Sequence, residues 1–142
     1  TFYFALVGAP DYLARHGRPH EPEDLKEHVC LRYRFPSNGP LQEWAFTSRS
    51  DDILWKRSNP LVFNNLEALI GAAVAGFGLA YVPSFTVQQA LQNQQLEAVM
   101  ADHISAHGRF SVLWPSSRHL LPKLRVFVDF LAEHMTLGSP KA

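Results

Sequence analysis

The segment LVFNNLEALIGAAVAGFGLAYVPS, residues 61–84, contains the pattern that decides the fold. A short apolar run is followed by two asparagines, a helix-like stretch rich in small residues, and a second apolar run. The segment predicts a short buried strand, a helix packed closely against a sheet and stopped by Gly78, and a second buried strand. Apolar residues recur at the spacing of one helical face, at Leu66, Leu69, Ile70, Ala73, Val74 and Phe77.

Downstream of this segment the alternation of strand and helix continues. FTVQQALQNQ, residues 85–94, predicts a more polar helix, and LEAVM, residues 96–100, predicts a third strand. After a polar loop, RFSVLWP at 109–115 predicts another strand, and residues 121–135 predict a final helix with two apolar stripes. Strands that alternate with helices in this order are typical of crossover units on a parallel sheet, so the fold class is α/β.

Upstream, the pattern predicts two strands separated by two short helices. FYFALVGA at 2–9 indicates a strand, after which Asp11 caps a helix that ends at Gly17. PEDLKEH, residues 22–28, indicates a second short helix with proline in its first turn, and VCLRYRF from Val29 a second strand. Beyond a turn cluster, two further strands are predicted to pair as a hairpin, EWAFT at 43–47 and DDILWKR at 51–57.

Composition limits the classes of function. The 142 residues suffice for one ordinary domain, and 46% of them are hydrophobic. Thirteen basic residues balance thirteen acidic ones, which disfavours nucleic-acid binding by this chain. No stretch is apolar enough to span a membrane, and the first residues do not resemble a secretory signal. With a single cysteine, Cys30, a cytoplasmic location is expected.

The sequence contains no convincing catalytic or metal-binding set. The histidines show no HExxH spacing, and His16, His20 and His28 are expected to be solvated at helix ends or turns. Cys30 is expected to be a buried structural thiol rather than a nucleophile. Motifs for hydrolase, dinucleotide and P-loop sites are absent from the sequence. We therefore expect no catalytic residues, no metal and no cofactor.

Asn64 and Asn65 are the most informative polar residues. Asn64 followed three residues later by Glu67 resembles a capping box, which satisfies free backbone N–H groups at a helix start. A second asparagine is more than a cap requires. Because the start of a helix after a parallel strand lies at the carboxyl edge of the sheet, where open α/β folds bind ligands, Asn65 is predicted to contact a ligand. Helix boundaries read from sequence shift by a few residues, so the reverse assignment of the two roles is the alternative.

Several stretches taken in order resemble the C-terminal effector-binding domain of LysR-type transcriptional regulators. They are GAPDYLARHGRPHEPEDLKEHVCLRYR, a tryptophan-containing hairpin, NNLEALIGAAVAGFGLAYVPSFTVQQAL, LEAVM and FSVLWPSSRHLLPKLRVFVDFLAEH. The resemblance covers nearly the whole chain. It implies a small-molecule effector-sensing domain, without enzymatic activity, of a DNA-binding transcriptional regulator that forms homo-oligomers. The DNA contact would come from an N-terminal helix-turn-helix that this chain does not contain.

The resemblance also implies a three-layer, periplasmic-binding-protein-like fold of type II with crossover hinge strands. Residues 10–108 would form the second subdomain, residues 3–9 and 109–115 the two crossover strands, and residues 121–135 a helix that returns to the first subdomain. Most of that first subdomain is expected to be missing from the chain. This expectation accounts for a final helix with two apolar stripes.

Carried over position by position, the resemblance implies an effector site between the subdomains. Arg34 could pair with an anionic effector. More commonly, an arginine in such a position is exposed, with its stem over apolar surface. The expected effector-binding residues are Val7, Gly8, Tyr33, Arg34, Phe35, Asn64, Asn65, Pro83, Ser84 and Phe85.

Two other classes of function are compatible with the same residues. Half of a periplasmic-type solute-binding protein would have the same fold and a transport role, although the chain shows no secretory signal. An enzyme is the remaining class, but the sequence lacks a convincing acid, base or nucleophile set.

Overall fold

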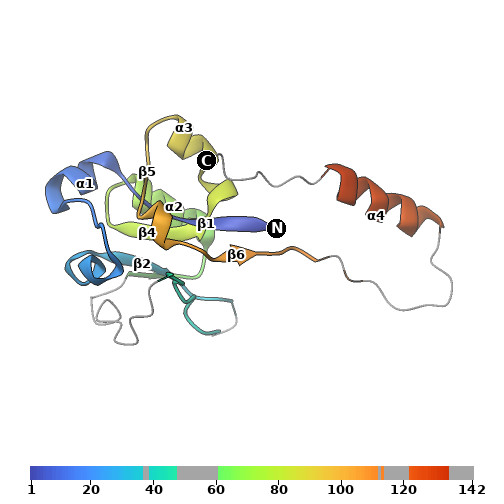
Figure 1. The fold of residues 1–142 in the computed structure, drawn as a ribbon, viewed down its shortest axis with the longest axis horizontal. Helices are drawn as coiled ribbons and strands as arrows, with labels where there is room; N and C mark the ends of the chain where they lie inside the picture. Colours follow the sequence, from blue (N-terminus) through green and yellow to red (C-terminus); the bar gives the residue numbers. More distant parts are fainter. Residues whose placement is uncertain (37–38, 48–60, 112, 114–121, 135–142) are drawn as a thin grey trace.

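A computed structural model of the chain describes residues 1–36, 39–47, 61–111, 113 and 122–134. Its helices and strands surround one mixed sheet (Figure 1). In chain order they are β1 (Phe2–Gly8), α1 (Pro10–His16), the 3₁₀ helix η1 (Pro22–Glu27), β2 (Cys30–Tyr33), β3 (Leu61–Phe63), α2 (Leu66–Val74), β4 (Leu79–Pro83), the 3₁₀ helix η3 (Ser84–Thr86), α3 (Gln88–Gln92), β5 (Glu97–Val99), the 3₁₀ helix η4 (Ala101–His103), β6 (His107–Gly108) and α4 (Pro122–His134).

The strand order is β3-β2-β4-β1-β5, and the short strand β6 pairs with the start of β1. β2 is parallel to β3 and β4, as the alternation of strand and helix predicts. β1 is antiparallel to both of its neighbours, β4 and β5, so β5 runs in the same direction as β2, β3 and β4. The first strand of the chain is therefore inserted, in the opposite direction, into an otherwise parallel set.

The core lies along the two central strands. Leu6 and Val7 of β1 and Leu79, Ala80 and Val82 of β4 are all fully buried. α1 covers this region near the end of β1, where Gly8 leaves room for the side chains of Leu79 and Leu13. β4 is buried as predicted, whereas Leu61 and Val62 of β3 are each 44% exposed. The prediction of a buried strand at 61–63 is wrong because β3 is the edge of the sheet.

Two predicted helix ends differ from the structure. Pro10 occupies the first turn of α1 and Ala9 precedes it, so Asp11 lies inside the first turn and is not the cap. α2 ends at Val74, and Gly76, with φ of +81°, is the residue that takes the left-handed conformation after it. Gly78, the predicted stop, lies two residues later and is a glycine for a different reason: a Cβ there would overlap the carbonyl oxygen of Val29.

The first half of the predicted hairpin is not a strand. Residues 43–47 form neither a helix nor a strand, and 51–57 lie outside the described residues. Trp44 packs on Tyr81 of β4 with ring centroids 5.7 Å apart, and the Tyr81 hydroxyl donates to the Ala45 carbonyl at 3.3 Å. Burial raises the pKa of Tyr81 to about 12, so this hydroxyl keeps its proton. At its far end the segment is bound by the Thr47 N–H, which donates to the His103 carbonyl at 2.8 Å.

The C-terminal part of the chain also departs from expectation. β6 comprises His107 and Gly108, and the described part of 109–115 contains no strand. α4 follows and lies apart from the sheet (Figure 1), with none of its residues buried. Within the described ranges, no helix is both long and apolar enough to cross a membrane.

Candidate functional site

The carboxyl edge of the sheet brings together eight of the ten predicted site residues. Tyr33 pairs in register with Phe63, and the Arg34 N–H donates to the Phe63 carbonyl at 2.7 Å, so Arg34 and Asn64 leave β2 and β3 side by side. β4 is parallel to β2 and ends on the same side. The eight residues at this edge are Tyr33, Arg34, Phe35, Asn64, Asn65, Pro83, Ser84 and Phe85.

The other two predicted residues lie at the opposite edge. Val7 pairs with Ala80, near the start of β4, and is fully buried. Gly8, one residue further, is packed against Leu79 and is also buried. Because β1 is antiparallel to its neighbours, its end lies where they begin. The structure therefore does not bring Val7 and Gly8 to the edge that the other eight residues share.

The start of β1, rather than its end, lies at the carboxyl edge. Phe4 pairs in register with Pro83, so Phe2 and Phe4 belong to the carboxyl edge. Phe2 contacts Phe85 edge to face, with ring centroids 5.5 Å apart. Sequence patterning alone cannot find these residues, because an apolar strand has the same pattern in either direction.

The cap of α2 is formed by the second of the two asparagines rather than the first. Asn65, not Asn64, is the N-cap of α2, and its side-chain oxygen accepts from the Ala68 N–H at 2.9 Å. The capping box expected between Asn64 and Glu67 is not formed. Asn64 is exposed, and no hydrogen bond joins its side chain to a described residue. Asn64 is thus the member of the pair whose amide can meet a ligand.

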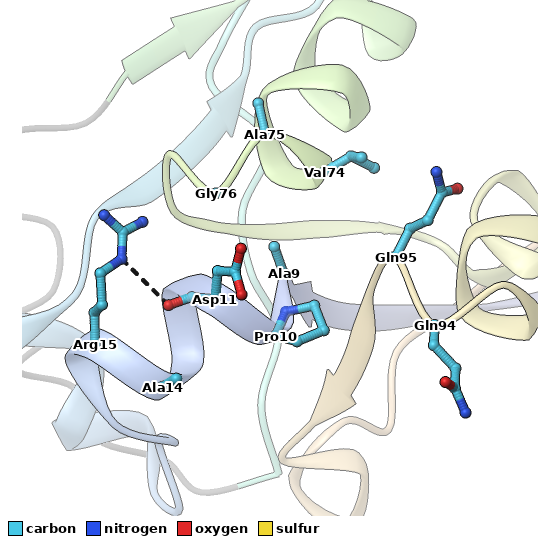
Figure 2. A pocket seen from close by; sticks show the side chains of 10 residues that line it. All are labelled: Ala9, Pro10, Asp11, Ala14, Arg15, Val74, Ala75, Gly76, Gln94 and Gln95. Atoms are coloured by element: carbon cyan, nitrogen blue, oxygen red, sulfur yellow. Dashed lines mark hydrogen bonds between the residues drawn. The ribbon is translucent and has the colours of Figure 1, made fainter.

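Neither of two hollows in the described part of the chain is lined by any of the eight residues at the carboxyl edge. The smaller, of about 310 Å³, lies beside β1 where that strand changes partner from β5 to β6, and Phe4, Val99 and Ile104 are among its lining residues. The larger, of about 780 Å³, is wide open and is drawn in Figure 2. It lies between α1, the end of α2 and the turn before β5, so it is remote from the carboxyl edge. The smaller hollow is the nearer of the two to the candidate site, because its lining includes Phe4, which pairs with Pro83.

Charge at the carboxyl edge is supplied by Arg34. Its side chain is exposed, and its Nη1 donates to the Gly39 carbonyl at 3.4 Å. A guanidinium has five N–H donors, so most of them can serve a ligand. Arg32, two residues earlier, is instead only 5% exposed, and its Nη2 donates to the Gln42 carbonyl at 2.7 Å.

His28 is buried, so the prediction of a solvated side chain is wrong for this histidine. The Tyr12 hydroxyl accepts from the Val29 N–H at 3.0 Å and lies 3.1 Å from Nδ1 of His28. Burial lowers the pKa of His28, and the nearby His16 lowers it further. A neutral imidazole leaves Nδ1 free to accept the hydroxyl proton of Tyr12. This network joins α1, η1 and the start of β2 away from the carboxyl edge.

Cys30 is buried, as predicted, with its Sγ 3.8 Å from the carbonyl oxygens of Leu25 and His28. Burial in this position is typical of a structural thiol. Across the described residues, no group of three or more histidine, cysteine or acidic side chains could hold a metal ion.

Comparison with known proteins identifies the family of this chain. Residues 1–136 match the family model described as the LysR substrate binding domain. The chain belongs to this LysR substrate-binding domain family. It is 30% identical over 133 residues to the HTH-type transcriptional regulator CrgA of Neisseria meningitidis serogroup C. The matched region covers 93% of this chain and 44% of that protein. It is 27% identical over 127 residues to the HTH-type transcriptional regulator PgrR of Escherichia coli, covering 89% of this chain and 42% of that protein.

Solved structures of LysR-type regulators have the same fold. The regulatory domain of CrgA from N. meningitidis superposes with a TM-score of 0.72 at 29% identity, over 94% of this chain and 65% of that one. A full-length variant of AphB superposes with a TM-score of 0.69 at 23% identity, over 92% of this chain and 44% of that one. The predicted fold class, a periplasmic-binding-protein-like fold of type II, is confirmed. These relatives are regulators, so the comparisons do not support the solute-binding alternative. The chain spans less than half the length of both curated relatives.

Proposed function

We propose that this LysR substrate-binding domain senses a small-molecule effector at the carboxyl edge of its sheet. The observation that carries the proposal is the family match over residues 1–136. The edge supports it, because an exposed amide, a hydroxyl and aromatic side chains converge there from β2, β3 and β4, at Asn64, Ser84, Phe35 and Phe85. In the complete regulator, which acts in the cytoplasm as a homo-oligomer, a helix-turn-helix outside this chain contacts DNA. The domain has no catalytic role.

The assignment of residue ranges to the two subdomains is part of this proposal. Residues 10–108 form the second subdomain, and residues 3–9 and 109–115 cross to the first subdomain, with 121–135 as its returning helix. An effector shifts the regulator between two arrangements only if it binds them with different affinity, since equal affinity shifts nothing. A site between two subdomains meets that requirement, because opening and closing change its contacts.

The test uses the full-length regulator and a reporter under a promoter that it controls. Small metabolites are screened for a change in reporter output, first with the wild type and then with Asn64→Ala. The proposal expects at least one compound to alter reporter output in the wild type. The Asn64→Ala variant should need a higher concentration of that compound for the same change in output. An output that no compound changes, or a dose response identical in the variant, would contradict the proposal.

We further propose that the effector is anionic and pairs with Arg34. Thermal shift of this chain with aliphatic and aromatic carboxylates as probes, each matched to its amide, tests the charge. A carboxylate that raises the melting temperature of the wild type, while its amide does not, is expected to lose its effect in Arg34→Gln. Arg15→Gln is the matched control, because Arg15 is an exposed arginine at the opposite edge (Figure 2). Equal shifts in the two variants would contradict the role of Arg34.

A further inference from the structure

Three phenylalanines from three separate segments form a closed surface cluster beside the carboxyl edge. Phe2 begins β1, Phe85 lies in η3 directly after β4, and Phe110 follows β6 by two residues. Ring centroids are 5.5 Å apart between Phe2 and Phe85, 4.8 Å between Phe2 and Phe110, and 5.9 Å between Phe85 and Phe110. All three distances are within the range of favourable aromatic pairs. We call these three residues the phenylalanine clamp.

The backbone opposite Phe2 is adapted to the clamp. Phe2 pairs in register with Gly108 of β6, and a Cβ on Gly108 would overlap the Phe2 ring. The ring therefore lies over the glycine of the neighbouring strand, so a side chain at residue 108 would displace it. Phe85 is 37% exposed and Phe110 is 56% exposed, so the clamp lies outside the buried core.

The clamp connects two parts of the molecule that have different roles. β1 and β6 form a two-stranded ribbon at their paired ends, Phe2–Tyr3 and His107–Gly108, and this ribbon runs out beyond the sheet (Figure 1). Phe85 lies in the 3₁₀ turn that presents Ser84 at the carboxyl edge. A shift of that turn moves Phe85 against two rings, that of Phe2 at the start of β1 and that of Phe110 two residues beyond β6.

We propose that Phe85 is a positioning residue that couples the carboxyl edge to the ribbon of β1 and β6. This inference rests on the proposed function, because it assumes that an effector contacts the edge. With Phe85 packed on Phe2 and Phe110, the ribbon is held at one angle to the sheet. When an effector moves the Ser84–Thr86 turn, Phe85 moves with it and the ribbon takes a second angle. Coupling of this kind needs one element whose two arrangements both sites influence, and in this proposal the clamp is that element.

Hydrogen exchange on this chain tests the clamp without any effector. In Phe85→Ala the amides of the ribbon, and the adjacent Phe4 N–H that donates to the Ala106 carbonyl, should exchange about tenfold faster, the factor expected for losing one to two aromatic pairs. Amides that pair β2 with β4 should keep their protection. Phe85→Tyr retains the ring and should exchange like the wild type. Phe35→Ala is the matched control, because Phe35 is an exposed phenylalanine at the same edge whose ring packs on Tyr33.

Two results would overturn the clamp. One is ribbon exchange in Phe85→Ala that equals exchange in Phe35→Ala. The other is an equal acceleration in the ribbon and in the β2–β4 pairing, which would indicate only a loss of global stability.

The coupling role is measured separately, in the full-length regulator with its reporter. Phe85→Ala should change reporter output before any compound is added, and Phe85→Tyr should restore it. Faster ribbon exchange with unchanged output would overturn the coupling while leaving the proposed function intact. If the wild-type regulator responds to no compound, the proposed function fails, whereas the exchange result on the clamp remains valid.

Discussion

Asn65 and Asn64 differ in what they contribute, although they are adjacent and identical in type. Asn65 accepts a hydrogen bond from the Ala68 N–H and so satisfies one free donor at the start of α2. Replacing an N-cap asparagine by alanine typically costs about 1 kcal/mol, so we expect Asn65→Ala to lower the free energy of unfolding by about that amount. Urea denaturation measures it, with Asn64→Ala as the control. Equal losses in the two variants would contradict the assignment of the cap.

His28 makes the stability of the domain depend on pH. Its pKa is lowered in the folded state by burial and by His16, while Asp24 and Glu27 act in the opposite direction. The folded state therefore keeps His28 neutral at pH values where the unfolded chain binds a proton. The contribution of His28 to the free energy of unfolding is fully present above the unfolded pKa of about 6.5. It is lost as the pH falls below that value toward the lowered folded pKa.

Urea denaturation between about pH 7.5 and pH 5 checks this dependence. Asparagine offers an oxygen near the place of Nδ1, so His28→Asn can still accept from Tyr12. We expect the difference in unfolding free energy between the wild type and His28→Asn to shrink as the pH falls. His20→Asn, a change at an exposed histidine, serves as the control. A difference that stays constant with pH would show that His28 does not titrate in this range.

At the scale of elements, two glycines in and after α2 have opposite effects on stability. A Cβ added at Gly71, inside the helix, would meet no other described atom within 4 Å beyond the helix's own backbone, whereas Gly76 has φ of +81°. We expect Gly71→Ala to stabilise the domain by about 0.5–1 kcal/mol, because alanine favours the helix and limits the unfolded chain. Gly76→Ala should destabilise it by about 1–2 kcal/mol, because alanine resists the left-handed conformation.

Thermal or urea unfolding of the two variants gives the comparison directly, since each removes one glycine from the same helix region. A loss of stability in Gly71→Ala would mean that something packs on the exposed side of α2. Unchanged stability in Gly76→Ala would mean that the chain can leave α2 by another route.

Most of the elements could be predicted from the sequence, whereas their directions and ends could not, and the strands predicted at 43–47 and 109–115 are not found in the described residues. Periodicity and turn residues located β1, β2, α2, β4 and β5, because these signals are local. The antiparallel direction of β1 depends on its pairing with Tyr81 and Val99, far away in the sequence, so local patterns do not reveal that Val7 and Gly8 lie at the edge opposite the other eight residues. The burial of His28 was missed for the same reason, since its partner Tyr12 belongs to another helix.

Over the whole molecule, the exposed apolar surface of α4 is the main liability of the isolated chain. Val126 is 69% exposed, and Phe127 and Phe130 are each 54% exposed. Exposed apolar surface of this kind promotes association. We expect the chain to self-associate as its concentration rises, and Phe127→Lys to weaken the association in sedimentation velocity. Ala132→Lys adds the same charge on the same helix without removing a ring, so an equal effect in that variant would contradict a role for Phe127.

The insertion of β1 between β4 and β5 has a consequence for the order of folding. The backbone of residue 7 pairs with residue 80 on one side and with residue 98 on the other, so it is paired only after both partners have been synthesised. During synthesis from the N-terminus, this apolar strand leaves the ribosome before its partners and finds its place in the sheet nearly last. Contacts this distant in sequence slow folding and leave apolar segments exposed meanwhile. Nascent chains that stop short of β5 should therefore be clients of chaperones rather than folded intermediates.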